Sequence, residues 1–135
     1  PQHGHWMNRD DREALPWMIT RTRNPWPKKI VWHQSGRTHE RFYWLAVARG
    51  TAKGGQTVEA EVKGQEITLS AGGRKELKLR LSDQLLDLDQ PVVVKADGRE
   101  VFRGKVERDV QAIWNSLQER PDVRAVATAE LQLKF

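Results

Sequence analysis

The stretch TVEAEVKGQEITLSAGGRKELKLRL, residues 57–81, decides the fold of this chain. Apolar and polar residues alternate through it in three runs, separated by turn residues at Gly64 and at Gly72-Gly73. Alternation with a period of two places the apolar side chains of a run on one face, as in a half-buried β-strand. The stretch therefore predicts three consecutive strands, with inward positions at Val58, Ala60, Val62, Ile67, Leu69, Ala71, Leu77, Leu79 and Leu81.

Further runs on both sides of this stretch also carry strand signals. They lie at 30–32, 41–49, 92–96, 100–107 and 127–135. The run 41–49 is apolar on both faces, which is typical of a strand in the middle of a buried sheet. The pair Asp97-Gly98 predicts a tight type I′ turn between the two strands that flank it.

Helical patterns occur at two places. Residues 8–20 predict a short helix with acidic residues in its first turn, where they suit the positive end of the helix dipole. Two prolines within residues 24–27 then impose an extended linker. A second helix is predicted over 110–120, with Asp109 as its cap and with an apolar face formed by Val110, Ile113, Trp114 and Leu117.

These elements predict a mainly β protein. The expected fold is an antiparallel two-sheet, Ig-like β-sandwich of about seven to eight strands. One helix lies near its C-terminus, and a short helical segment precedes it. Residues 1–50 contain 9 Lys and Arg against 4 Asp and Glu, whereas residues 51–135 contain 14 of each. We therefore expect a domain boundary at the linker, with residues 1–27 as one unit and residues 28–135 as the sandwich.

The composition limits the classes of function. The chain has 135 residues, a net charge of +5 and no cysteine, which excludes disulfides and thiolate metal sites. No stretch approaches the ~20 apolar residues of a membrane span, so no membrane partner is expected. The sequence leaves the cellular compartment open.

The patterns for catalysis and for metal or phosphate binding are incomplete. The four serines lie outside any Gly-x-Ser-x-Gly motif, so no complete Ser–His–acid triad is present. The loop Gly50–Gly55 lacks the Gly-Lys-Ser/Thr order of a phosphate-binding loop. His3 and His5 could form a metal site with Asp10 and Asp11, but the two aspartates suit a helix start equally well. No cofactor or metal is predicted, and a metal site at His3 and His5 stays an alternative.

The tryptophans of the basic half have two interpretations. Trp26, Trp32 and Trp44 stand among prolines and apolar residues, which favours packing in an interface between domains. Basic and aromatic residues together also occur in nucleic-acid-binding proteins, but this packing argues against nucleic acid as a partner. Exposed Trp faces on a β-sandwich would instead suit a module that binds carbohydrate or another polymer, which is the alternative function.

Part of the sequence resembles the C-terminal region of α/β-hydrolases of the dienelactone hydrolase and prolyl-oligopeptidase-type esterase group. The likeness is carried by residues 3–45, above all by His3-Gly4-His5-Trp6-Met7, Ala14-Leu15-Pro16-Trp17-Met18 and Arg41-Phe42-Tyr43-Trp44-Leu45. In that family the Gly-His-Trp-Met stretch carries the triad histidine, which corresponds to His5. The resemblance implies that residues 1–27 are the end of a hydrolase domain and that the remainder is an appended β-sandwich.

The resemblance also implies a function. In this fold the nucleophile and the acid precede the histidine, so the chain by itself would be inactive. We predict a non-catalytic accessory or docking domain of an esterase or peptidase, whose partner is the hydrolase domain of the same parent chain. The Trp-rich segment would form the interface, and the isolated chain would expose an apolar patch and tend to self-associate.

Overall fold

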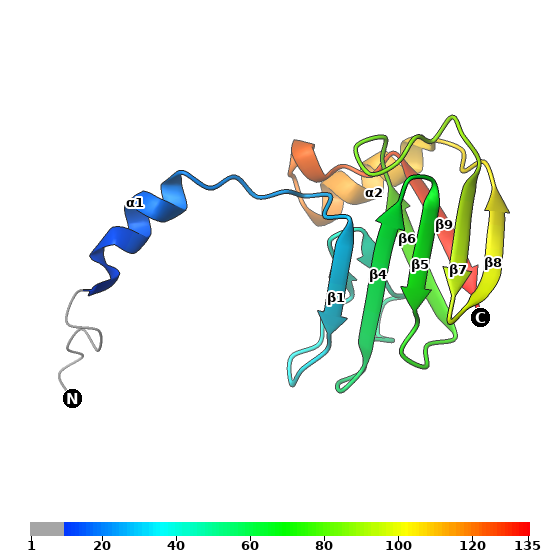
Figure 1. The fold of residues 1–135 in the computed structure, drawn as a ribbon, viewed down its shortest axis with the longest axis horizontal. Helices are drawn as coiled ribbons and strands as arrows, with labels where there is room; N and C mark the ends of the chain where they lie inside the picture. The colour runs from blue at the N-terminus through cyan, green and yellow to red at the C-terminus, as the bar shows by residue number, and fades with distance from the viewer. Residues whose placement is uncertain (1–9) are drawn as a thin grey trace.

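The computed structural model describes residues 10–135, which form two β-sheets packed face to face around a shared core (Figure 1). The strand order of the first sheet is β1-β4-β5-β7-β8, with bounds Lys29–His33, Thr57–Lys63, Glu66–Ser70, Val92–Ala96 and Arg99–Gly104. The order of the second sheet is β2-β3-β6-β9, with bounds Arg41–Phe42, Leu45–Ala46, Glu76–Leu81 and Ala129–Lys134. The predicted mainly β sandwich is confirmed, with nine strands over the described residues instead of seven to eight.

One strand pair departs from the antiparallel arrangement. Strands β5 and β7 are parallel, whereas all other neighbouring strands in the described part of the chain are antiparallel. Parallel neighbours need a crossover connection. Here the chain leaves β5, forms β6 in the opposite sheet and returns through residues 82–91, so β7 enters the first sheet in the same direction as β5.

The alternating residues of 57–81 form the centre of the sandwich, as predicted. Their inward positions in the three strands are all buried, namely Val58, Ala60, Val62, Ile67, Leu69, Leu77, Leu79 and Leu81. Strand β6 adds a feature that alternation does not explain, because Arg80 between two inward leucines is buried as well.

Two reverse turns shape the strands on either side. The predicted long strand over 41–49 is wrong, because β2 and β3 pair with each other as a tight hairpin. Tyr43 in its turn has φ 53°, a left-handed conformation that reverses the chain and brings Trp44 into the core. The predicted turn at Asp97-Gly98 is confirmed, since φ is 48° and 83° at the two residues and type I′ requires both to be positive.

Both predicted helices are present in the described residues. Helix α1 (Ala14–Ile19) follows a 3-10 turn at Asp10–Glu13, and positions 8 and 9 of the predicted helix lie outside the described residues. Helix α2 (Val110–Glu119) begins as predicted, because the side chain of Asp109 accepts a hydrogen bond from the N–H of Gln111 at 2.9 Å. No helix over residues 10–135 is long and apolar enough to cross a membrane.

Helix α2 packs through small residues. Its buried residues are Ala112 and Ser116, and Ser116 Oγ accepts a hydrogen bond from the N–H of Ala127 at 3.2 Å. These short side chains let the helix backbone approach the second sheet closely. The larger apolar face, which such a pattern normally directs toward a core, is exposed at Val110 and Trp114 instead.

Helix α1 stands away from the sandwich, as Figure 1 shows, and an extended segment joins it to β1. The segment is anchored only near its end, where the indole of Trp26 is buried against the sandwich. The boundary between residues 1–27 and 28–135 stays a prediction, and Trp26, on the N-terminal side of that boundary, belongs to the core of the sandwich.

Candidate functional site

The predicted catalytic histidine, His5, lies outside the described residues, and so does His3. Within residues 10–135 no serine forms a hydrogen bond with a histidine. His33 does contact a hydroxyl, since its Nδ1 lies 2.8 Å from Thr57 Oγ1, but this pair joins two exposed side chains across β1 and β4. The role of His5 stays a prediction.

Metal ligands are not grouped in the described part of the chain. Over residues 10–135, no three His, Asp or Glu side chains are close enough together to hold a metal ion. The alternative metal site at His3 and His5 lies outside the described residues.

The three tryptophans predicted to form an interface lie inside the sandwich. Trp26, Trp32 and Trp44 are each 5% exposed or less. Trp26 Nε1 donates a hydrogen bond to the carbonyl of Arg124 at 2.9 Å, and Trp44 Nε1 donates to the carbonyl of Pro27 at 2.8 Å. Buried indoles with satisfied N–H groups belong to the core of the domain itself. A partner of the folded domain would therefore contact other side chains.

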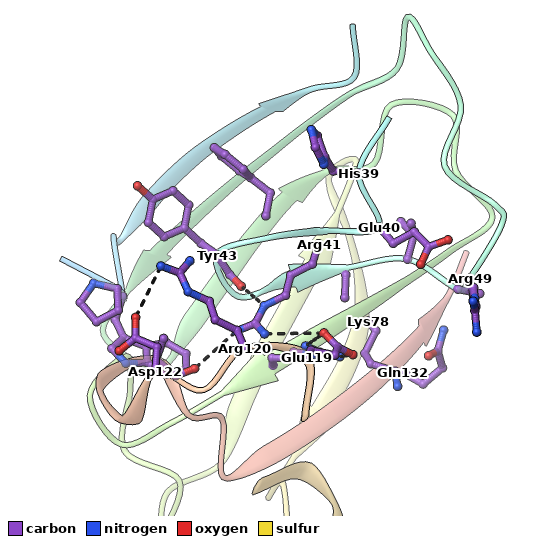
Figure 2. Close-up of a pocket in the computed structure, with 18 of the residues that line it drawn as sticks. His39, Glu40, Arg41, Tyr43, Arg49, Lys78, Glu119, Arg120, Asp122 and Gln132 are labelled. Carbon is purple, nitrogen blue, oxygen red and sulfur yellow. Dashed lines mark hydrogen bonds and ion pairs between the residues drawn. The ribbon is translucent and has the colours of Figure 1, made fainter. Parts of the chain in front are cut away.

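A pocket of about 930 Å³ opens beside the β2–β3 hairpin, between β6 and the C-terminal end of α2 (Figure 2). The linker supplies part of its wall through Arg23 and Pro25. Phe42 and Tyr43 of the hairpin add aromatic surface. Its charged centre is made of arginine and glutamate side chains from three separate elements.

Arg80 of β6 is the most buried charge in this centre, with 5% of its side chain exposed. Its Nη1 donates to Glu119 Oε2 at 2.5 Å, and its Nη2 donates to Glu119 Oε1, so the guanidinium holds the carboxylate with two parallel bonds. Its Nε lies 3.3 Å from Glu130 Oε1. Burial, the largest single influence, lowers the pKa of Arg80, but the hydrogen bonds to Glu119 and the charges of Glu119 and Glu130 together raise it above its ordinary value.

Arg41 of β2 is poorly partnered by comparison. Its Nε donates to the carbonyl of Tyr43 at 3.3 Å and its Nη2 to that of Ala125 at 3.4 Å, both long for hydrogen bonds. Its Nη1 is buried, makes no hydrogen bond and lies 3.6 Å from Glu119 Oε2. Burial, and then the nearby charge of Arg80, lower the pKa of Arg41. The pocket thus contains a guanidinium whose Nη1 makes no hydrogen bond and has Glu119, 3.6 Å away, as its charged neighbour.

Cations exceed anions around this pair. Arg120 lies 3.6 Å from Asp122, and Lys78 lies 2.8 Å from Glu130. Among the described residues, Arg23 and Arg49 form no ion pair. The pocket is lined by six basic and three acidic residues, namely Arg23, Arg41, Arg49, Lys78, Arg80 and Arg120 against Glu40, Glu119 and Asp122.

The sequence did not predict this pocket. Arg80 occupies a polar position of an alternating strand, which predicts a solvated side chain, and the pattern over 41–49 predicts one long strand and not the hairpin that carries Arg41. The one available signal was the excess of basic residues in the first 50 positions. Comparisons of the chain with protein-family models, with curated proteins and with solved structures gave no match.

Proposed function

We propose that residues 28–135 are a non-catalytic accessory domain that docks on the catalytic body of an α/β-hydrolase-type esterase or peptidase. The observation that carries this proposal is the uncovered apolar surface of α1. No residue of the helix is buried, and its large apolar side chains are between 59% and 83% exposed, namely Leu15, Trp17, Met18 and Ile19. A contiguous apolar surface of this kind marks a site that a partner covers.

Helix α1 also lacks the means to be stable by itself. It has six residues, whereas isolated helices shorter than about 12–15 residues are marginal in water. Pro16 in its first turn contributes no backbone N–H. Packing against another body would stabilise it, and the resemblance indicates which body that is, because this segment corresponds to the last helix of the hydrolase domain.

The sandwich has a second apolar surface near the same linker. Trp114 on α2 is 57% exposed, and Val110, the first residue of this helix, and Val123, in the 3-10 turn that follows it, are exposed too. The linker reaches this end of the sandwich, where Trp26 is hydrogen-bonded to Arg124. If the partner covers this surface as well, the Trp114 indole would be buried at the junction, where a Trp side chain buries about 150–250 Å² in all.

The coding sequence upstream of Pro1 tests the class of the parent protein. We expect a Gly-x-Ser-x-Gly motif about 100–150 residues earlier, the spacing of a hydrolase domain of ordinary size. In the full-length protein, His5→Ala should abolish ester hydrolysis, because the serine proton would have no acceptor. Absence of the motif, or hydrolysis by the variant at near the wild-type rate, would contradict the proposal.

Self-association tests the docking surface in the chain of residues 1–135. We expect sedimentation velocity to show association of the wild-type chain, and an apolar dye to bind it. The double variant Trp17→Ser, Trp114→Ser should be monomeric, whereas the control Val31→Ser, at an exposed position of β1, should associate like the wild type. A monomeric wild-type chain that binds no dye would overturn the docking role.

The alternative function, a module that binds carbohydrate or another polymer, requires exposed aromatic faces. Burial of Trp26, Trp32 and Trp44 leaves Trp114 as the exposed indole of the sandwich over residues 28–135. A glycan-binding screen separates the two functions. Specific binding that is lost in Trp114→Ala would favour the module, and no binding favours the docking domain.

A further inference from the structure

We propose that the pocket beside the β2–β3 hairpin binds the carboxylate of a small organic acid with a ring in its body, and that Arg41 is the main contact. Neither the resemblance nor the docking role assigns a ligand to this pocket. The inference does not rest on the proposed function, because the residues that carry it differ from those of the apolar helix surfaces.

Arg41 has an N–H donor group, at Nη1, that makes no hydrogen bond. A guanidinium has five N–H donors in a fixed plane, and buried polar groups in folded proteins are almost always hydrogen-bonded. Arg41 makes two long bonds to carbonyls and leaves Nη1 buried and unbonded. A carboxylate is the group that best matches the forked donors of arginine, so a ligand carboxylate that displaces Glu119 from beside Arg41 would satisfy this nitrogen.

The side chain of Glu119 already places one carboxylate among the arginines of the pocket. Its carboxylate is bonded twice by Arg80 and lies 3.6 Å from Arg41. Yet 47% of its side chain is exposed. Glu119 is also the last residue of α2, and the negative end of the helix dipole there disfavours an acidic side chain. Glu119 is therefore a weakly placed internal carboxylate that competes with an external one.

The walls of the pocket supply a further argument. Its volume of about 930 Å³ is within the range of small-molecule sites, about 300–1,000 Å³. The rings of Phe42 and Tyr43 meet edge to face with centroids 4.9 Å apart and give the pocket an aromatic wall. The excess of basic lining residues attracts anions into a concave site. Together these features fit a ring that carries a carboxylate.

Matched pairs of probes test this chemistry in the chain of residues 1–135. We would titrate it with benzoate against benzamide and with glucuronate against glucose, following amide shifts by NMR. Each pair keeps the ring and changes the charge, and the two pairs distinguish an aromatic acid from a sugar acid. We expect one acid to bind at least about tenfold more tightly than its neutral counterpart, with shifts at the pocket residues.

Three variants locate the contact. Arg41→Gln should weaken binding of the acid about tenfold or more, because the free donor is lost. Glu119→Gln should strengthen it severalfold, because the competing charge is removed. Arg103→Gln is the control, since Arg103 pairs with Glu100 on β8, away from the pocket, and should leave the affinity unchanged.

The outcomes decide the proposal in both directions. Equal binding of acid and neutral probe in both pairs, or equal binding by wild type and Arg41→Gln, overturns it. If Arg41→Gln does not fold, Glu119→Gln remains decisive, because a merely structural Glu119 would give no gain in affinity. Trp17→Ser, Trp114→Ser should bind the acid like the wild type, so failure of the docking role and failure of the carboxylate site can be told apart.

Discussion

The tryptophans of the sandwich and those of the helices lie in opposite environments. Trp26, Trp32 and Trp44 are buried, and two of them donate their indole N–H to backbone carbonyls. Trp17 on α1 and Trp114 on α2 are more than half exposed. Arg21, two residues beyond the end of α1, lies over the Trp17 ring, with its guanidinium carbon 4.7 Å from the ring centroid.

This contrast separates the tryptophans that form the core of the sandwich from those on the surface of the two helices. The sandwich uses its large aromatic side chains to fill its own core. The helices direct theirs outward, and under the proposed docking role the partner would contact α1 and α2. Substitutions should therefore have opposite consequences in the two regions.

The largest difference is expected between Trp44 and Trp114. Trp44→Ala removes a fully buried ring and its hydrogen bond to Pro27, which should lower the free energy of unfolding by about 3–5 kcal/mol. Trp114→Ala removes an exposed ring and should change it by less than about 0.5 kcal/mol. Urea unfolding of both variants checks the comparison, and equal losses would break it.

The parts of the fold that could be predicted from the sequence are those where burial repeats along a strand. Alternation predicted β4, β5 and β6 because burial of one face acts on every second residue of a strand. The hairpin within 41–49 was missed because its turn depends on Tyr43, and a tyrosine with positive φ carries no signal in composition. The packing face of α2 was missed because the two small residues that set it, Ala112 and Ser116, are weak in any hydrophobic pattern.

The candidate site was beyond sequence reasoning for a different reason. Arg80 and Glu119 are separated by 39 positions and lie on a strand and a helix. Each is polar and by itself predicts a solvated side chain. Only the approach of α2 to the second sheet brings them together as an ion pair beside Arg41. His5, which the resemblance indicates, depends instead on residues outside the described part of the chain.

A second prediction concerns the turn between β5 and β6, where the sandwich is tight without any side chain. Gly72 has φ +61°, and a Cβ built on it would lie 1.9 Å from the carbonyl oxygen of Thr57. Gly72→Ala combines a strained left-handed backbone, at least about 1 kcal/mol, with overpacking, about 1–3 kcal/mol. We expect a loss of about 2–4 kcal/mol in the free energy of unfolding, measured by urea titration.

The neighbouring glycine provides the control for this turn. Gly73 also has a positive φ, +73°, but a Cβ there meets nothing within 4 Å. Gly73→Ala should therefore show the backbone strain alone, about 1–2 kcal/mol. If the two variants lose the same stability, contact with Thr57 is not what requires glycine at position 72.

The smallest effect concerns Glu119, which ties α2 to the sandwich through Arg80. The hydrogen bonds from Arg80 lower the pKa of Glu119 from its ordinary value of 4.5 and outweigh the burial that raises it. A lowered folded-state pKa gives stability that is present above the unfolded-state pKa and is lost as the pH falls through the folded-state pKa. Since Glu119 is half exposed, the contribution should be at most about 1 kcal/mol at pH 7.

The pH dependence of the free energy of unfolding distinguishes the Arg80–Glu119 ion pair from an ordinary surface ion pair. Wild type should exceed Glu119→Gln in stability at pH 7, and the difference should shrink well below pH 4.5, where Glu119 becomes protonated and resembles the variant. Glu100 is the matched control: Arg103 lowers its pKa too, but both side chains are exposed on β8. Glu100→Gln should therefore change stability little at either pH. If the two glutamates behave alike in urea titrations at pH 7 and pH 3, then α2 is held on the sandwich by Ala112 and Ser116 alone, and the Arg80–Glu119 bond does not stabilise it.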